Sequence, residues 1–391
     1  MTEYPPPPPE IPKPQDVHFS DDVWNQVLTH MPDTDESLRE KAEAAQRTQQ
    51  LVEELVAAQE YPLRPLESVR RLVEPFVGAE IAGVNTAWDG RLLIDWRGDG
   101  KQTTSAESPD GRSETLDISL FQHSVDYVMP LPSGNWLRYQ ARVTPEVDRT
   151  LTPAQRARTA HTPDSAWVID TSGHVIASGS LGDACLEASV GSAGQIWVPY
   201  FDEAPQRGLA GIWERNAHGD MEFVEDSIVP TESVAEDSGY GRFTAGYTGM
   251  TIFDENLRVV GRHDREKSDT DICEVYMSAT DGERYWYFSY PDWNIDCVGP
   301  EGQAPPIHDD RHKAGFLIAA GEQIAFFSGP GPDRDSLFLR KSDGSEEMSI
   351  VTMPNGAALT PGMVAAWGGT LHYVADNVWY RVDALTSLAP E

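Results

Sequence analysis

Five carboxylates in three short segments are the residues of this chain best suited to chemistry. They are Asp126 in SVDYV, Asp183 and Glu187 in GDACLEAS, and Asp271 and Glu274 in TDICEVY, and each precedes or enters an apolar run. If these runs are equivalent strands of a repeated fold, their carboxylates converge around one channel mouth. A ring of oxygen ligands suits Ca²⁺ or another hard divalent cation, and two close carboxylates can raise the pKa of one of them for acid–base work. The alternative is that these acids cap strand ends in contact with solvent.

A second group of candidates is aromatic and lies in less regular segments. Trp213 in GLAGIWER and Trp293 in SYPDWNID, with Tyr240, Phe243 and Tyr247 in GYGRFTAGYTG, are suited to anchoring a protein partner or stacking on a sugar. Four of the five fall in the long segment 204–249, which is rich in glycine, aromatic and acidic residues. Long irregular segments of this kind are often functional.

Composition and missing motifs narrow the function classes. The 391 residues include 30 Lys plus Arg and 63 Asp plus Glu, a formal net charge of −33. Such a charge disfavours direct binding to nucleic acid or to an anionic membrane, because both need clustered positive side chains. The sequence shows no Walker loop, no GxSxG elbow and no HExxH, so no organic cofactor is expected. Three cysteines without CxxC spacing and no visible secretory signal predict a cytoplasmic protein, with export as part of a larger assembly as the alternative.

The elements that must position these residues are β-hairpins. From about Gly78 onward, short β-branched and aromatic runs alternate with Gly-containing turns, which is a hairpin signal. Eight such hairpins are expected, at Thr86–Asp95, Val125–Tyr139, Trp167–Ile176, Val190–Tyr200, Thr251–Val260, Met277–Phe288, Phe316–Phe327 and Val364–Tyr373.

The spacing of turn glycines indicates how the hairpins repeat. Gly90, Gly134, Gly194, Gly282, Gly321 and Gly369 are separated by 44, 60, 88, 39 and 48 residues. A four-stranded propeller blade takes about 40–50 residues. The pattern therefore predicts an all-β, WD40-like propeller of six blades, with insertions at 144–163 and 204–249. If the longer interval hides a further blade, the count is seven.

The first 77 residues have a different character. Residues 1–17 are predicted to be a proline-rich tail, and 18–77 a helical arm with one helix ending near Gln59 and a shorter one over Leu66–Val73. Whether the arm packs on its own chain or on a partner is left open. The propeller then spans 78–391, and its ring is expected to close by pairing Asn377–Val382 with an N-terminal strand at Glu80–Trp88.

Three segments also resemble a known family. Val125–Leu137, Ala166–Asp183 and Gly194–Glu203 are similar to the pattern of uncharacterised, mainly actinobacterial, propeller-like proteins. The resemblance implies the propeller fold and an actinobacterial source, and it carries no activity. The chain departs from the pattern after Glu203, where the long acidic insertion begins.

Two classes of function fit these observations, with a third beside them. The first is a noncatalytic interaction module, a rigid acidic propeller that binds a protein partner, of basic character, through its loops and N-terminal arm. The second is a metal-assisted lactone or ester hydrolase at a carboxylate-lined channel mouth. A carbohydrate-binding propeller is the third. Absence of catalytic motifs favours the module, and the sequence leaves the oligomeric state undetermined.

Overall fold

A computed structural model describes most of the chain from Tyr61 to Leu388. The described ranges are 61–118, 127–141, 164–182, 185–200, 211–215, 221–225, 249–263, 274–290, 293–308, 315–328, 335–341 and 344–388, with residues 46, 47, 50, 53, 54, 56 and 57. The last seven are helical. The rest of the predicted tail and arm, including the helix expected to end near Gln59, lies outside the described residues.

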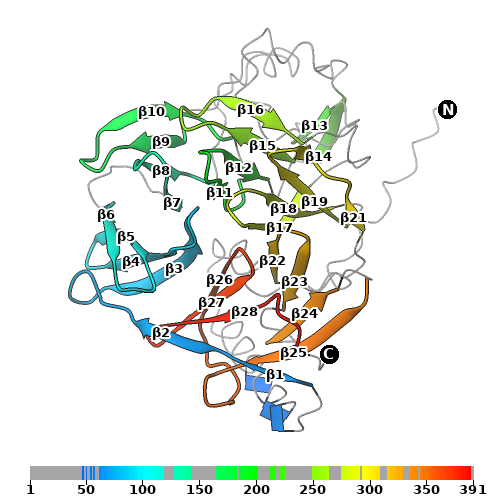
Figure 1. Ribbon diagram of the computed structural model, residues 1–391. Coiled ribbons are helices and arrows are strands. Elements are labelled where there is room, and N and C mark those ends of the chain that lie inside the picture. Colours follow the sequence, from blue (N-terminus) through cyan, green and yellow to red (C-terminus); the bar gives the residue numbers. More distant parts are fainter. Residues whose placement is uncertain are drawn as a thin grey trace, which may run out of the picture.

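Six sheets, antiparallel except for one added strand, follow one another as the blades of a propeller around a central channel (Figure 1). In each blade the first strand is innermost and later strands lie progressively outward, except in blades 5 and 6, whose outermost strands come from before blade 1. Blade 1 consists of β3 (Glu80–Thr86), β4 (Leu92–Gly98), β5 (Lys101–Glu107) and β6 (Ser113–Asp117). Blade 2 consists of β7 (Tyr127–Pro130), β8 (Trp136–Tyr139), β9 (Ala166–Ile169) and β10 (Val175–Gly179). Blade 3 consists of β11 (Ser189–Val190), β12 (Ile196–Pro199), β15 (Met250–Phe253) and β16 (Val259–Arg262). Blade 4 consists of β17 (Glu274–Thr280), β18 (Tyr285–Tyr290), β19 (Asn294–Gly299), β20 (Gly302–Gln303) and β21 (Ile307–His308). Blade 5 consists of β22 (Phe316–Ala320), β23 (Gln323–Phe327), β24 (Ser336–Arg340), β25 (Glu346–Thr352) and β1 (Leu63–Pro65). Blade 6 consists of β26 (Met363–Trp367), β27 (Thr370–Ala375), β28 (Val378–Asp383) and β2 (Glu67–Arg71).

The predicted glycine repeat is confirmed as one turn per blade. Each of the six glycines lies in the turn between the first and second strands of its blade, and φ is positive at all six, for example +85° at Gly134 and +83° at Gly194. A left-handed residue at this point is easiest for glycine, which has no Cβ. All eight predicted hairpins are present as antiparallel pairs.

The blade count is six, because the longest glycine interval contains an insertion and no further blade. β12 pairs directly with β15, although 50 residues separate the ends of these strands, Pro199 and Met250. Between them, the described residues form only a separate hairpin of β13 (Gly211–Arg215) and β14 (Met221–Glu225). The insertion at 144–163 occupies the same position in blade 2, between β8 and β9. Both insertions therefore leave neighbouring blades on the same face of the propeller, opposite the glycine turns.

The strand that closes the ring is not the one predicted from the sequence. β2 pairs with β28 as the outermost strand of blade 6, so Leu66–Val73 is not a helix and Glu80–Thr86 is not the closing strand but the innermost strand of blade 1. The register shifts at Val69, which is a β-bulge. The bulge puts Leu66, Val69 and Leu72 into the core at three-residue spacing, and this spacing imitates a helix.

A second N-terminal strand reinforces the closure. β1 adds to blade 5 by parallel pairing with β25, so one short segment joins blades 5 and 6. Arg64, which is 4% exposed, donates to the backbone oxygens of Asp383 (2.7 Å) and Thr386 (2.6 Å) and to Ser349 Oγ (3.2 Å). A buried guanidinium thereby ties the N-terminal strands to the C-terminal segment, so residues assigned to the arm belong to the propeller.

The hydrophobic core lies between blades and is rich in large aromatic side chains. Trp96, Trp136 and Trp379 are fully buried, one each in blades 1, 2 and 6. The largest cluster joins blades 1, 2 and 3. Within the described part of the chain, no helix is long and apolar enough to cross a membrane.

Candidate functional site

The glycine turns close one end of the central channel. A Cβ added at Gly90 of blade 1 would lie 2.7 Å from the Trp367 ring of blade 6, and one at Gly282 of blade 4 would lie 2.9 Å from the Trp88 carbonyl oxygen of blade 1. Blades 1 and 4 are opposite in a six-membered ring, so their turns meet across the channel. The Ser192 amide of blade 3 also donates to the Gly282 carbonyl at 2.6 Å. These contacts between the turns close the channel at this end and form its floor.

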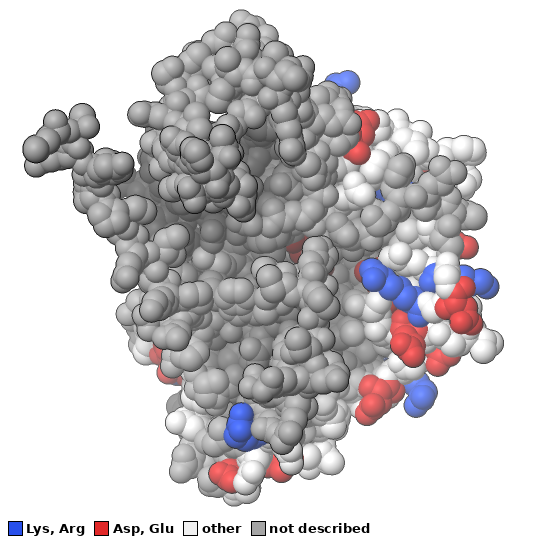
Figure 2. Space-filling model, turned by 180° about the vertical axis from the view of Figure 1, so that it is seen from behind, with Lys and Arg blue, Asp and Glu red and all other residues white. Residues whose placement is uncertain are grey.

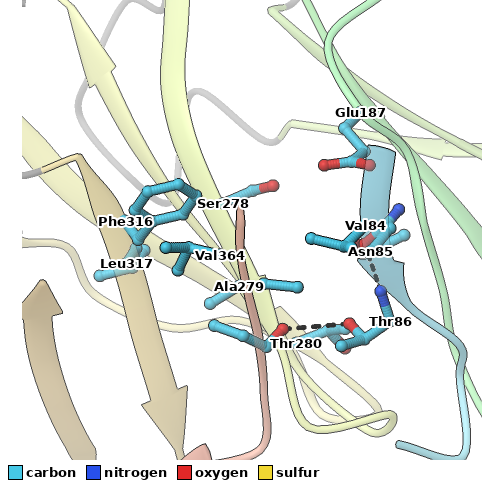
Figure 3. Close-up of a pocket in the computed structure, with 13 residues that line it drawn as sticks. Val84, Asn85, Thr86, Glu187, Ser278, Ala279, Thr280, Phe316, Leu317 and Val364 are labelled. Atoms are coloured by element: carbon cyan, nitrogen blue, oxygen red, sulfur yellow. Dashed lines mark hydrogen bonds between the residues drawn. The ribbon is translucent and has the colours of Figure 1, made fainter. Parts of the chain in front are cut away.

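Above this floor lies a cavity of about 70 Å³ between the innermost strands (Figure 3). It is lined by side chains of β3, β11, β17, β22 and β26 and by one residue that precedes β11, namely Val84, Asn85, Thr86, Glu187, Ser189, Ser278, Ala279, Thr280, Phe316, Leu317, Val364, Ala365 and Ala366. Innermost strands have one edge without a neighbouring strand, so their backbone polar groups there need water or a polar ligand.

Glu187 is the carboxylate of this cavity, and a bulge places it there. Cys185 pairs with Tyr200, and Ser189 pairs with Trp197, so three residues face two on the neighbouring strand. An extra residue in one strand re-aims side chains locally. The Ala188 amide, next to Glu187, donates to the buried Tyr139 hydroxyl at 2.6 Å. Tyr139 of blade 2 is thus a positioning residue for the bulge.

Two residues of blade 1 approach the Glu187 carboxylate. Asn85 of β3 hydrogen-bonds to it, as its direction in Figure 3 suggests. Asp95 of β4 opposes Gly83, where the missing side chain leaves room for the carboxylate, and Thr104 Oγ1 donates to Asp95. Removal from water raises the pKa of Asp95 to about 6, although the Thr104 hydrogen bond lowers it.

The pKa of Glu187 is raised to about 8, first by removal from water and second by the negative charge of Asp95, against the lowering effect of Asn85. Tyr285 and Tyr139 are the other titratable groups that its charge influences. The unshifted pKa is 4.5, so folding around Glu187 at pH 7 costs about 3 kcal/mol at 1.36 kcal/mol per pKa unit. Groups that cost stability in this way are concentrated at functional sites.

The predicted ring of carboxylates can be followed only in part. Glu187 reaches the channel cavity as expected. Asp126, Asp183 and Asp271 lie outside the described residues, and Glu274 begins β17 with a side chain that is not described. Among the described residues, no three His, Cys, Asp or Glu side chains are grouped as metal ligands. The divalent-cation site therefore stays a prediction.

Of the predicted partner-binding residues, only Trp293 has a described side chain. It follows β18 with φ of +53°, is half-buried, and packs against Tyr276 (ring centroids 5.4 Å apart) and Phe288 (5.5 Å). Trp213 lies in β13, whose side chains are not described, and Tyr240, Phe243 and Tyr247 lie outside the described residues. The partner role of all five stays a prediction.

Asp95 and Asn85 were not predicted from the sequence. A signal for Asp95 was present, because LLIDW is an apolar strand interrupted by one acid, and acids inside buried strands are rare unless paired or functional. Asn85 gave no comparable signal, since an amide near the end of a strand is ordinary.

Charged side chains of both signs gather along one edge of the back view (Figure 2). In blade 1, Arg91 pairs with Asp89 (2.8 Å) and Glu114 (2.9 Å), and Arg112 pairs with Asp110 (2.8 Å). Exposed pairs of this kind contribute little to stability. The described surface of this blade is therefore a mixed one, and its acids are partly neutralised by arginine.

Comparison with known proteins identifies the fold and no family. Neither a family model nor a curated protein matches the sequence. Virginiamycin B lyase from Staphylococcus aureus is 11% identical, with 81% of this chain and 98% of that chain covered and a TM-score of 0.39. The calcium-binding protein regucalcin from Agrobacterium tumefaciens is 9% identical, with 83% and 95% covered and a TM-score of 0.39. Hsv2 from Kluyveromyces lactis is 9% identical, with 79% and 75% covered and a TM-score of 0.41. These likenesses concern the propeller fold alone.

Proposed function

We propose that this protein is a noncatalytic interaction module, a rigid acidic propeller that binds a protein partner at the outer edge of blades 2 and 3. The observation that carries the proposal is exposed aliphatic surface on the outermost strands of these two blades. Val175 and Ile176 of β10 are each 55% exposed, and Val259 and Val260 of β16 are 38% and 59% exposed.

The position of these side chains supports a docking role. Among the described residues, β10 and β16 are outermost strands with no further strand paired to them, and such an edge can accept an added strand. Natural proteins usually protect such edges with charge or proline, and here aliphatic side chains stand in their place. The same two blades carry both long insertions, at 144–163 and 204–249, so loops and apolar edge belong to one region.

The partner is proposed to be basic. Segment 204–249 contains eight acidic and three basic residues, and charge complementarity mainly speeds encounter and selects partners. Trp213, Tyr240, Phe243 and Tyr247 are the proposed apolar anchors within that acidic segment, and Trp293 of blade 4 is proposed as a fifth anchor. The N-terminal arm is proposed as a further contact, and a cytoplasmic location stays a prediction.

The test is co-purification of the tagged full chain from its native host under gentle salt, with three single variants. Ile176→Asp and Val260→Asp place a charge on the proposed edge and should lose the partner. Val77→Asp is the matched control, because Val77 is 94% exposed and lies away from blades 2 and 3. Recovery of the wild type as a lone monomer, or equal partner loss in Val77→Asp, would count against the proposal.

A second candidate function is the hydrolase, and Glu187 is the observation that favours it. A carboxyl group with a pKa near 8 can donate a proton at neutral pH, as a general acid must. Hydrolysis of simple lactones or esters that needs added divalent cation and disappears in Glu187→Gln would support this candidate over the module. No observation favours carbohydrate binding further.

The family assignment is also a proposal. We infer from the segments Val125–Leu137, Ala166–Asp183 and Gly194–Glu203 that the chain belongs with the actinobacterial propeller-like proteins they resemble. A search of related genomes for chains sharing all three segments, and the bulge residue Glu187, tests this assignment.

A further inference from the structure

We propose that the channel cavity is a binding site for a primary alkylammonium group, with the Glu187 carboxylate as its counterion. The site lies in the channel, apart from the outer edge of blades 2 and 3, so this proposal and the proposed partner binding can fail independently.

The charge of the cavity favours one positive ligand group. Glu187 is the only ionisable residue among the thirteen that line the cavity, and none of these is Lys or Arg. Asp95, which does not line the cavity, adds a second negative charge that is felt at the Glu187 carboxylate. An isolated buried carboxylate is unfavourable, and an ion pair with hydrogen bonds relieves that cost.

Hydrogen-bonding capacity suits an ammonium group, which has three N–H donors. The carboxylate of Glu187 and the hydroxyl oxygens of Ser189 and Ser278 are acceptors on the cavity wall. Within the described residues there is no group of three acidic, His or Cys side chains that would suit a divalent metal ion better. One carboxylate with neutral oxygens matches a monovalent cation.

The size and the apolar side of the cavity match a short alkyl chain. The volume of about 70 Å³ is room for about five to seven waters at roughly 10–15 Å³ each, and n-butylammonium has five non-hydrogen atoms. Phe316 and Val364 form an apolar wall across the cavity from Glu187 and Asn85, and Val84 adds apolar surface on the Glu187 side (Figure 3). The closed floor means that the ligand would enter from the opposite end of the channel.

Two sources can supply this group, a free small amine or the lysine side chain of a protein, which has the same terminal chain. Isothermal titration of the full chain with n-butylammonium at pH 8.5 tests the site, because Glu187 is then largely ionised and the amine still carries its proton. n-Butanol is the neutral ligand control. N-acetyl-lysine methylamide and a lysine-containing peptide distinguish the two sources.

We expect n-butylammonium to bind with a Kd in the millimolar range or tighter, at least tenfold more weakly to Glu187→Gln, and unchanged to Asp110→Asn, an exposed carboxylate in blade 1. Equal binding of the lysine ligands supports a protein lysine as the source, and their failure supports a free amine. No binding to the wild type, binding that Glu187→Gln leaves unchanged, or equally tight butanol binding would overturn the proposal. Ca²⁺ binding that Glu187→Gln abolishes, with none by the amine, would also overturn it.

Discussion

Replacing Glu187 with glutamine should make the propeller more stable at neutral and alkaline pH. Glu187 lies in the channel with a pKa of about 8, against 4.5 for an unshifted group. Its folded form holds the proton more tightly than the unfolded form does. The stability associated with this proton is therefore complete below pH 4.5 and is lost as the pH rises toward 8.

The magnitude follows from the two pKa values. With 1.36 kcal/mol per pKa unit, ionisation of Glu187 lowers the free energy of unfolding by about 1 kcal/mol at pH 5, about 3 at pH 7 and about 5 at pH 9. Glutamine is close in shape and has no charge to lose. The difference between Glu187→Gln and wild type should then grow by about 4 kcal/mol between pH 5 and pH 9.

Urea unfolding followed by tryptophan fluorescence at single pH steps measures this difference. Asp95→Asn is an informative companion, because the charge of Asp95 helps to raise the pKa of Glu187, and its loss should move the Glu187 transition to lower pH. Asp110→Asn, at an exposed position, should follow the wild type. Parallel Glu187→Gln and wild-type curves from pH 5 to pH 9 would contradict a raised pKa for Glu187 in the channel.

Three further predictions concern the frame that holds the channel. Burial lowers the pKa of His372 to about 4 from 6.5. The free energy of unfolding should therefore fall by up to about 3 kcal/mol as the pH drops from 6.5 to 4. In His372→Asn, urea unfolding should show a smaller fall over this pH range. Gly282→Ala combines φ of +88° with a Cβ 2.9 Å from a backbone oxygen, so it should lower the free energy of unfolding by about 2–4 kcal/mol. Gly321→Ala, at φ of +60° with nothing within 4 Å, should lower it by only about 1 kcal/mol. Similar losses of stability for both variants would contradict the closed floor of the channel. Arg64→Met removes three hydrogen bonds of a buried guanidinium and should lower the free energy of unfolding by about 2–4 kcal/mol. Arg71→Met, at an exposed position, should leave it nearly unchanged. Equal melting temperatures of the two variants would contradict a stabilising role for the Arg64 hydrogen bonds.

The sequence predicted the repeating part of the fold well, because period-two runs and glycine turns are local signals. Gly90 through Gly369 marked all six blades. The closing strand was mispredicted, since the bulge at Val69 gives buried residues a helical spacing, and its pairing with β28 is a contact between the two ends of the chain. No local pattern shows such a contact.

The site was predictable only where a residue type stood out. Glu187 was found because it precedes an apolar run predicted to be equivalent to those at Asp126 and Glu274. It enters the channel through a bulge, and the register that creates the bulge is set by pairing with Tyr200 and Trp197. Asp95 could have been noticed in LLIDW. Its coupling to Glu187 depends on blades 1 and 3 facing one channel, which follows from ring closure and not from sequence distance.

The most direct test of the proposed function is amide hydrogen exchange of the full chain, alone and bound to the partner recovered by co-purification. Binding at the proposed edge predicts slower exchange in β10 (Val175–Gly179) and β16 (Val259–Arg262), with little change in blades 5 and 6. Protection confined to blades 5 and 6 or to the glycine-turn face, with β10 and β16 unchanged, would contradict an interaction surface on blades 2 and 3.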